Sequence, residues 1–146
     1  MTRMMPSTDR SLPIALLRAR ERVMGPIRAL LSGAGLTEQQ WRVLRVVQES
    51  GPIDPTQIAE LACLLLPSLT RILQKLEEKQ LITRERDKED RRRQVVQIAP
   101  EGEKVIAGNI EASLALMNRT RQKMGEDRYE ALLDLLNELD EIDLSE

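Results

Sequence analysis

Hydrophobic positions recur every three to four residues along most of the chain, which predicts a mainly helical fold. The first helix is expected from residue 12 to about residue 31, bent or interrupted at Gly25-Pro26. Near the other end, Pro100 begins a predicted helix of about twenty-five residues, and a leucine-rich helix follows Gly125. Residues 1–11 lack this period and are expected to form a flexible N-terminus.

The middle of the chain contains three shorter helical patterns. Thr37, with Gln40 three residues later, has the sequence of a capping box at the start of the first helix. Asp54 or Thr56 is expected to cap the second. The third covers residues 67–76, where an apolar stripe for burial lies opposite a broad polar face. Two short helices in succession, the second with an exposed polar face, are typical of a helix-turn-helix.

A β-hairpin is expected directly after these helices. Two short segments, 82–86 and 94–99, read as strands, and Ile53 is expected to add a minimal third strand. Their connecting loop, residues 87–93, is charged and ends in three consecutive arginines. In a winged helix-turn-helix, one helix enters the major groove of DNA and a cationic hairpin loop reaches the backbone or the minor groove. The sequence therefore predicts a mainly α fold with a small β wing, whose DNA-binding lobe spans residues 36–99.

The helices outside this lobe carry apolar stripes with no obvious partner in so short a chain. They occupy residues 12–35 and 100–146, at the N- and C-terminal ends. The simplest second surface for their leucines is another copy of the chain, so an all-helical dimerisation region is expected there. The alternative is a monomeric helical bundle.

The net charge of −2 results from basic and acidic residues that lie in different segments of the chain. Residues 71–93 hold nine Lys and Arg against six Asp and Glu, whereas residues 126–146 hold one Arg against nine acids. A local basic surface matters more for phosphate binding than the overall charge. The basic segment coincides with the predicted polar-faced helix and hairpin, and the acidic tail is expected to face away from DNA.

The composition argues against an enzyme. The chain has no histidine and one cysteine, which excludes imidazole catalysis and any His-ligated or multi-cysteine metal site. No metal or cofactor is expected, and with no apolar run of membrane length and no secretory signal the expected location is cytoplasmic. The cysteine, Cys63, is expected to pack among neighbouring leucines. Redox sensing through Cys63 is an alternative.

Candidate DNA contacts follow from position and chemistry. Four side chains near the start of the polar-faced helix can reach base edges, because Arg can grip guanine and Gln can grip adenine; they are Ser68, Thr70, Arg71 and Gln74. Pro67 suits the first helical turn. Phosphate contacts are expected from free N–H groups at the start of the preceding helix and from nearby cations; these residues are Thr56, Gln57, Lys75, Lys79 and Arg84.

These features together resemble the multiple-antibiotic-resistance regulator (MarR) family of bacterial transcription factors. The most specific part is the loop sequence Asp87-Lys88-Glu89-Asp90-Arg91-Arg92, followed by Ala99-Pro100-Glu101-Gly102, where the family commonly has Thr-x-x-Gly. Three further stretches, 14–21, 36–42 and 62–70, are similar to regulators of homoprotocatechuate degradation. This resemblance implies a repressor of an aromatic-acid degradation operon that a phenolic or phenylacetate-type acid releases.

The resemblance also implies roles for particular residues. An arginine of the wing loop would enter the minor groove, held by the aspartate two positions earlier; here these are Arg92 and Asp90, with Arg91 and Arg93 as rivals. An aromatic-acid effector would lie between the dimerising helices and the DNA-binding lobe. The residues expected there are Trp41, Arg42, Arg18 and Leu16, although Trp41 can also be an ordinary core residue. The implied partners are a second copy of the chain and a palindromic double-stranded operator. A winged-helix protein-interaction module without a DNA role is the alternative.

Overall fold

The computed structural model describes residues 4–145 and confirms the expected mainly helical fold with a small β wing. Its helices are α1 (Leu12–Gly33), α2 (Glu38–Ser50), α3 (Pro55–Ala62), α4 (Leu66–Glu78), α5 (Pro100–Met124) and α6 (Glu126–Glu141). The strands are β1 (Ile82–Arg86) and β2 (Gln94–Ile98), which pair antiparallel with Ile82 opposite Ile98. Each expected helix and strand is therefore present.

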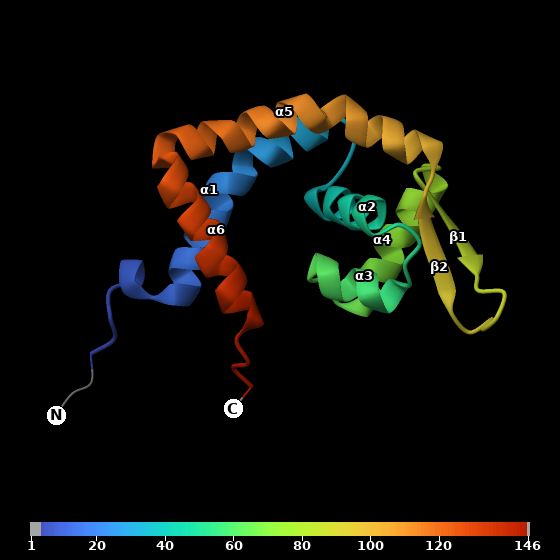
Figure 1. Ribbon diagram of the computed structural model, residues 1–146, viewed down its shortest axis with the longest axis horizontal. Helices are drawn as coiled ribbons and strands as arrows, with labels where there is room; N and C mark the ends of the chain where they lie inside the picture. The colour runs from blue at the N-terminus through green and yellow to red at the C-terminus, as the bar shows by residue number, and fades with distance from the viewer. Residues whose placement is uncertain (1–3, 146) are drawn as a thin grey trace.

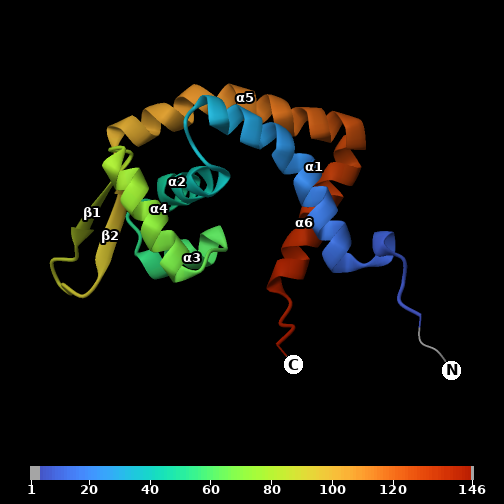
Figure 2. The same cartoon turned by 180° about the vertical axis from the view of Figure 1, so that it is seen from behind.

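The long helix α5 joins the two parts of the molecule. It runs along one edge of both views, with α1 and α6 beneath one half and α2, α3, α4 and the hairpin beneath the other (Figures 1 and 2). The hairpin loop lies at the end of the molecule opposite the two chain termini. The part formed by α2–α4 and the hairpin is called the reading lobe below.

Helix α1 was expected to bend or to be interrupted at Gly25-Pro26, and it passes through these residues without a break. The helix instead changes direction along its length, as both views show (Figures 1 and 2). A proline removes one helical hydrogen bond, which a long helix tolerates by bending. The segment expected to be flexible lies partly outside the described residues; within it, Thr8–Arg10 form one 3-10 turn before α1.

The core lies within the reading lobe, under α5. Helix α4 buries the four residues that its periodicity predicts, which are Leu69, Ile72, Leu73 and Leu76. They pack with residues of α2, α3, the strands and α5; the most deeply buried of these are Val43, Leu44, Val47, Ile58, Ala62 and Val96. Because these four residues of α4 point into the core, the opposite, polar face of the helix points toward solvent.

Local hydrogen bonds set the starts of α2 and α3. Thr37 and Gln40 form the expected capping box, in which the Thr37 hydroxyl accepts the Gln40 N–H and the Gln40 amide accepts the Thr37 N–H. Asp54, and not Thr56, caps α3 by accepting the Gln57 N–H at 2.9 Å. Ile53, directly before this cap, forms the expected β-bridge with Val96.

An ion-pair network ties α1 to the first turn of α2. Glu38 accepts hydrogen bonds from Arg20 at 2.5 Å and from the Arg28 Nε atom at 3.1 Å, and Arg28 also donates to Glu21 at 2.8 and 2.9 Å. Partial burial raises the pKa of the Glu38 carboxyl, but the hydrogen bonds and charges of the two arginines outweigh it and leave that pKa below its ordinary value.

This lowered pKa makes the network sensitive to acid. The Glu38 pairing stabilises the folded state above the unfolded pKa of about 4.3 and is lost as pH falls through the lower folded pKa. We expect Glu38→Gln to lower the urea midpoint at pH 7 and to differ little from the parent protein at pH 3. Glu49→Gln, an exposed residue of the same helix, is the control. Equal losses at both pH values would contradict the ion-pair account.

Helix α6 leaves its apolar residues uncovered in a single chain. None of its residues is buried, and the exposed fractions of four leucines are between 38% and 62%; these are Leu132, Leu133, Leu135 and Leu136. Apolar residues of α1 and α5, among them Leu12, Leu17, Leu114 and Met117, are similarly exposed. An apolar surface of this kind marks a site of association.

Within residues 4–145, no single helix has both the length and the apolarity to cross a membrane; α3 and α4 meet those criteria only together, as a pair bent by 106°.

The expected packing of Cys63 is wrong, since its side chain is exposed. Cys63 ends α3 with a left-handed backbone (φ 55°, ψ 52°), so it lies outside the buried stripe of that helix.

Candidate nucleic-acid interface and effector pocket

The polar face of α4 is exposed along its whole length. The side chains predicted to read bases or hold phosphates are all on this face and exposed; they are Pro67, Ser68, Thr70, Arg71, Gln74 and Lys75. Pro67 lies in the first turn, where its missing N–H costs nothing. The Thr70 hydroxyl donates to the Leu66 carbonyl at 3.0 Å and keeps lone pairs that can accept a hydrogen bond.

A cationic groove separates this face from the wing. Four arginines line it, namely Arg86, Arg91, Arg92 and Arg93, together with Thr56, Thr70, Leu66 and Asp54. Three of these arginines were predicted from the loop sequence. Arg86 was missed although Arg84 of the same strand was predicted, and Leu66 was missed because the helix was expected to begin one residue later. Alternation along β1 is the signal that places Arg84 and Arg86 on one face of that strand.

The expected pairing of Asp90 with Arg92 is present. The Asp90 Oδ1 atom accepts from both the Arg92 backbone N–H at 3.1 Å and the Arg92 Nε at 3.3 Å. The Arg92 side chain is 93% exposed, so it projects into solvent from an ordered turn. Two backbone hydrogen bonds close the loop at Arg93, one from the Asp87 N–H to its carbonyl and one from its N–H to the Asp90 carbonyl.

Four of the five predicted phosphate contacts have partners within the chain. Lys75 lies 3.7 Å from Glu78. Arg84 donates to Glu77 at 2.8 Å, which lowers the pKa of the Glu77 carboxyl. Lys79 donates to the Gly35 carbonyl at 2.7 Å. The Gln57 N–H is held by Asp54, so the prediction of a free N–H there is wrong. Thr56 is exposed beside the groove. The pairings of Arg84 and Lys79 could not be predicted from the sequence, because each joins separate elements. The loss of the free Gln57 N–H follows from the Asp54 cap, one of the two caps that the sequence suggested.

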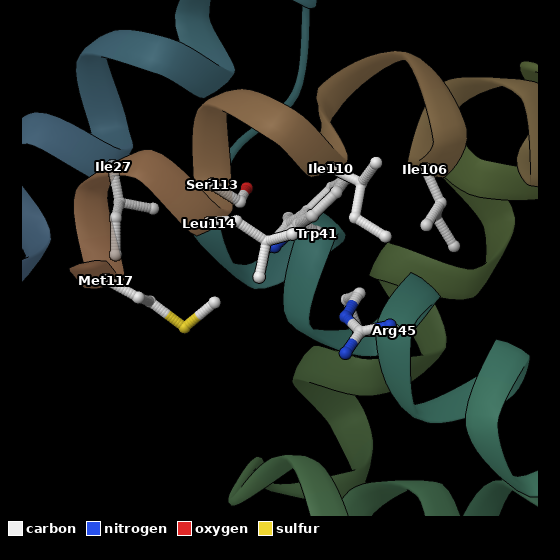
Figure 3. Close-up of a pocket in the computed structure, with 8 residues that line it drawn as sticks. All are labelled: Ile27, Trp41, Arg45, Ile106, Ile110, Ser113, Leu114 and Met117. Atoms are coloured by element: carbon white, nitrogen blue, oxygen red, sulfur yellow. The ribbon is translucent and has the colours of Figure 1, made fainter.

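A second site is an apolar pocket of about 250 Å³ between α1, α2 and α5 (Figure 3). Its walls are Ile27 from α1, Trp41 and Arg45 from α2, and five residues of α5, which are Ile106, Ile110, Ser113, Leu114 and Met117. The Trp41 ring faces the α5 side chains, and the Arg45 guanidinium lies beside the same opening. An aromatic wall with a single cation at its edge suits a flat apolar molecule with an anionic end.

The pocket contains one of the four predicted effector residues. Trp41 lines it, but Arg42 does not; the Nε atom of Arg42 is buried on another side of α2. Arg18 lines a shallow hollow on α1 with Glu21 and Pro26, and Leu16 also lies outside the pocket. Arg42, Arg18 and Leu16 therefore do not share this pocket with Trp41. Arg45 was missed, although it lies four residues after Trp41 and so shares a helix face with it.

Comparisons with known proteins agree with this geometry. Residues 36–93 match the MarR family. The HTH-type transcriptional regulator FarR of Neisseria gonorrhoeae is 36% identical over 137 residues, which cover 94% of each chain. The homoprotocatechuate degradative operon repressor of Escherichia coli is 42% identical over 93 residues, covering 64% of this chain and 63% of that protein.

Two solved structures have the same fold. NadR in complex with 4-hydroxyphenylacetate is 35% identical, with a TM-score of 0.85 over 97% of this chain and 100% of that one. The transcriptional repressor CouR, bound to a 23-mer DNA duplex, is 26% identical, with a TM-score of 0.83 over 96% and 99% of the two chains. With its polar α4 face, its arginine-lined wing and a near full-length match to a transcriptional regulator, the chain belongs to the MarR family of transcriptional regulators.

Proposed function

We propose that the protein is a dimeric repressor of an aromatic-acid catabolic operon, released from DNA by a small aromatic carboxylate. The observation that carries the proposal is one continuous surface of the reading lobe, where the exposed polar face of α4 adjoins a groove lined by four arginines. The polar face supplies base readout and the arginines supply phosphate or minor-groove contacts. The DNA-bound structure of CouR supports this use of the surface.

The proposal includes a division of the chain into two functional regions. Residues 36–99 act as the DNA-binding lobe, and residues 12–35 and 100–146 form the dimer interface. The uncovered leucines of α6 support the interface, because burying such a surface is the main driving force for association. Two lobes related by a two-fold axis suit a palindromic operator whose half-sites lie about one helical turn apart.

The effector is placed in the pocket next to Trp41. An aromatic ring stacks on or beside the indole, and the carboxylate pairs with Arg45. The complex of NadR with 4-hydroxyphenylacetate and the name of the homoprotocatechuate repressor support a phenolic or phenylacetate-type acid. Because α2 belongs to the reading lobe while Ile27 belongs to α1, a ligand held between them favours one placement of the lobe over another.

The test combines hydrodynamics with binding. Sedimentation of the full chain should give a dimer, and fluorescence anisotropy should detect preferential binding to a fragment upstream of its own gene over a scrambled duplex of equal length. The affinity should fall steeply with salt, since each neutralised phosphate adds to the slope. A monomer without any preference among these fragments would overturn the proposal.

Arg45 gives a sharper test of the effector site. Titration of 4-hydroxyphenylacetate should change the Trp41 fluorescence, and Arg45→Gln should weaken the apparent affinity about fivefold, because an exposed charge pair contributes up to about 1 kcal/mol. Arg42→Gln is the matched control and should leave that affinity unchanged. If Arg42→Gln has the larger effect, the carboxylate is held on the other side of α2.

A further inference from the structure

The three consecutive arginines of the wing loop are in different situations. Arg91 and Arg92 line the groove, and the Arg92 side chain is 93% exposed. Arg93 is 58% exposed and its Nη2 atom donates to the Asp54 Oδ2 atom at 2.9 Å. This contact joins residues 39 positions apart in the sequence, so it ties the wing loop to the start of α3.

Asp54 uses both carboxylate oxygens for structure. Its Oδ1 atom caps α3 by accepting the Gln57 N–H at 2.9 Å, and its Oδ2 atom holds Arg93. The side chain is only 18% exposed. The Gln57 N–H and the Arg93 guanidinium lower the pKa of the Asp54 carboxyl, so it is charged at neutral pH. An anion among the lining residues of a groove proposed to bind DNA would repel the phosphates, which favours a structural role for Asp54.

Separate contacts attach the strands and the loop of the wing to the rest of the lobe. Along the strands, Ile53 and Val96 exchange two backbone hydrogen bonds of 3.1 and 2.8 Å, and Arg84 donates to Glu77 of α4 at 2.8 Å. At the loop, the Asp54–Arg93 ion pair is the attachment to α3, and Arg93 also closes the loop through its own backbone. The strand contacts fix the base of the hairpin, whereas the loop beyond the strands depends on this ion pair for its position against α3.

From these contacts we propose that Asp54 and Arg93 form an anchor that orients the wing, and that only Arg91 and Arg92 of the three arginines contact DNA. The inference rests on the proposed DNA-binding function. It assigns Arg93, a candidate DNA ligand by sequence, to an intramolecular role. An oriented loop loses less conformational entropy when it binds, so the anchor raises affinity without contributing a DNA contact of its own.

The anchor predicts that removing the negative charge of Asp54 lowers the affinity for DNA, which is opposite to the usual effect. Removing an acidic charge next to a polyanion ordinarily raises affinity, because repulsion is relieved. We expect Asp54→Asn to weaken operator binding about three- to fivefold instead, since Asn keeps the helix cap but loses the ion pair with Arg93. Glu89→Gln, which removes an exposed carboxylate from the wing loop, is the matched control and should leave affinity unchanged or raise it.

The experiment measures affinity for the promoter fragment at several salt concentrations with the full chain. Asp54→Asn, Arg93→Gln and the double variant should bind equally weakly, because either change removes the same anchor. Their plots of log affinity against log salt should keep the parent slope, whereas Arg92→Gln should reduce the slope by about 1. In the DNA-free protein, hydrogen exchange of amides 87–93 should become faster in Asp54→Asn and Arg93→Gln but not in Glu89→Gln.

The possible results distinguish a failure of the proposed anchor from a failure of the proposed DNA-binding function. Tighter binding by Asp54→Asn, or a reduced salt slope in Arg93→Gln, would make Arg93 a DNA ligand and overturn the anchor while DNA binding itself stands. Unchanged loop exchange in both variants would overturn it as well. If the parent protein binds no promoter fragment, the proposed function fails, and the exchange measurement still decides whether the anchor orders the loop.

Discussion

An Arg92→Ala variant is expected to bind operator DNA at least tenfold more weakly than the parent protein while unfolding at the same temperature. The side chain is 93% exposed and contacts Asp90 alone among the described residues, so its removal leaves the packing intact. A guanidinium held at the tip of an ordered turn is suited to a narrow A·T-rich minor groove, where the negative potential is strongest.

Two measurements check this expectation. Anisotropy titrations at fixed salt give the affinity, and thermal denaturation gives the stability. Arg10→Ala, which removes an exposed arginine outside both the DNA-binding lobe and the proposed dimer interface, controls for the loss of one positive charge. Equal affinities of Arg92→Ala and the parent protein would remove Arg92 from the DNA interface.

Gly102→Ala is expected to destabilise the fold by about 2–3 kcal/mol, the cost of overpacking a site that cannot relax. A Cβ atom at this position would lie far inside the 3.0 Å limit of real Cβ contacts with the Leu81 carbonyl oxygen, and 2.8 Å from Ile98 Cγ1. The Leu81 carbonyl cannot move away easily, because it accepts the Ala99 N–H at 2.9 Å. Gly102 therefore allows α5 to pack directly on the end of the hairpin.

Gly108, on the same helix, supplies the matched control. A Cβ atom there meets nothing within 4 Å, so Gly108→Ala should stabilise the protein by about 0.5–1 kcal/mol through helix propensity. Urea denaturation of both variants measures the two free energies of unfolding. Similar effects of the two substitutions would contradict the role of close packing at Gly102.

The parts of the fold that depend on neighbouring residues could be predicted from the sequence. The Thr37–Gln40 capping box, the buried stripe of α4 and the hairpin strands each follow from a pattern within a few residues. The continuity of α1 through Pro26 could not, because bending and breaking a helix differ by packing along its whole length. The exposure of Cys63 likewise depends on the left-handed turn after α3.

Some features of the candidate site could also be predicted from the sequence, and others could not. The exposed face of α4 and the Asp90–Arg92 pair could be predicted, because both lie within single elements. Which arginine of α2 faces the pocket could not be decided without the rotation of that helix against α5, which selects Arg45 over Arg42. The partners of Arg84 and Arg93 are likewise set by how separate elements pack.

The length of α5 has a mechanical consequence. At about 1.5 Å per residue, the 25 residues of α5 form a helix about 37 Å long. The pocket lies near the middle of this helix, and the wing packs against its first turn. A tilt of α5 by about 5° around its middle displaces each end of the helix by about 1.6 Å. In the proposed dimer, the two-fold axis would repeat this displacement in the second subunit, so a small ligand in each pocket would change the spacing of the two lobes.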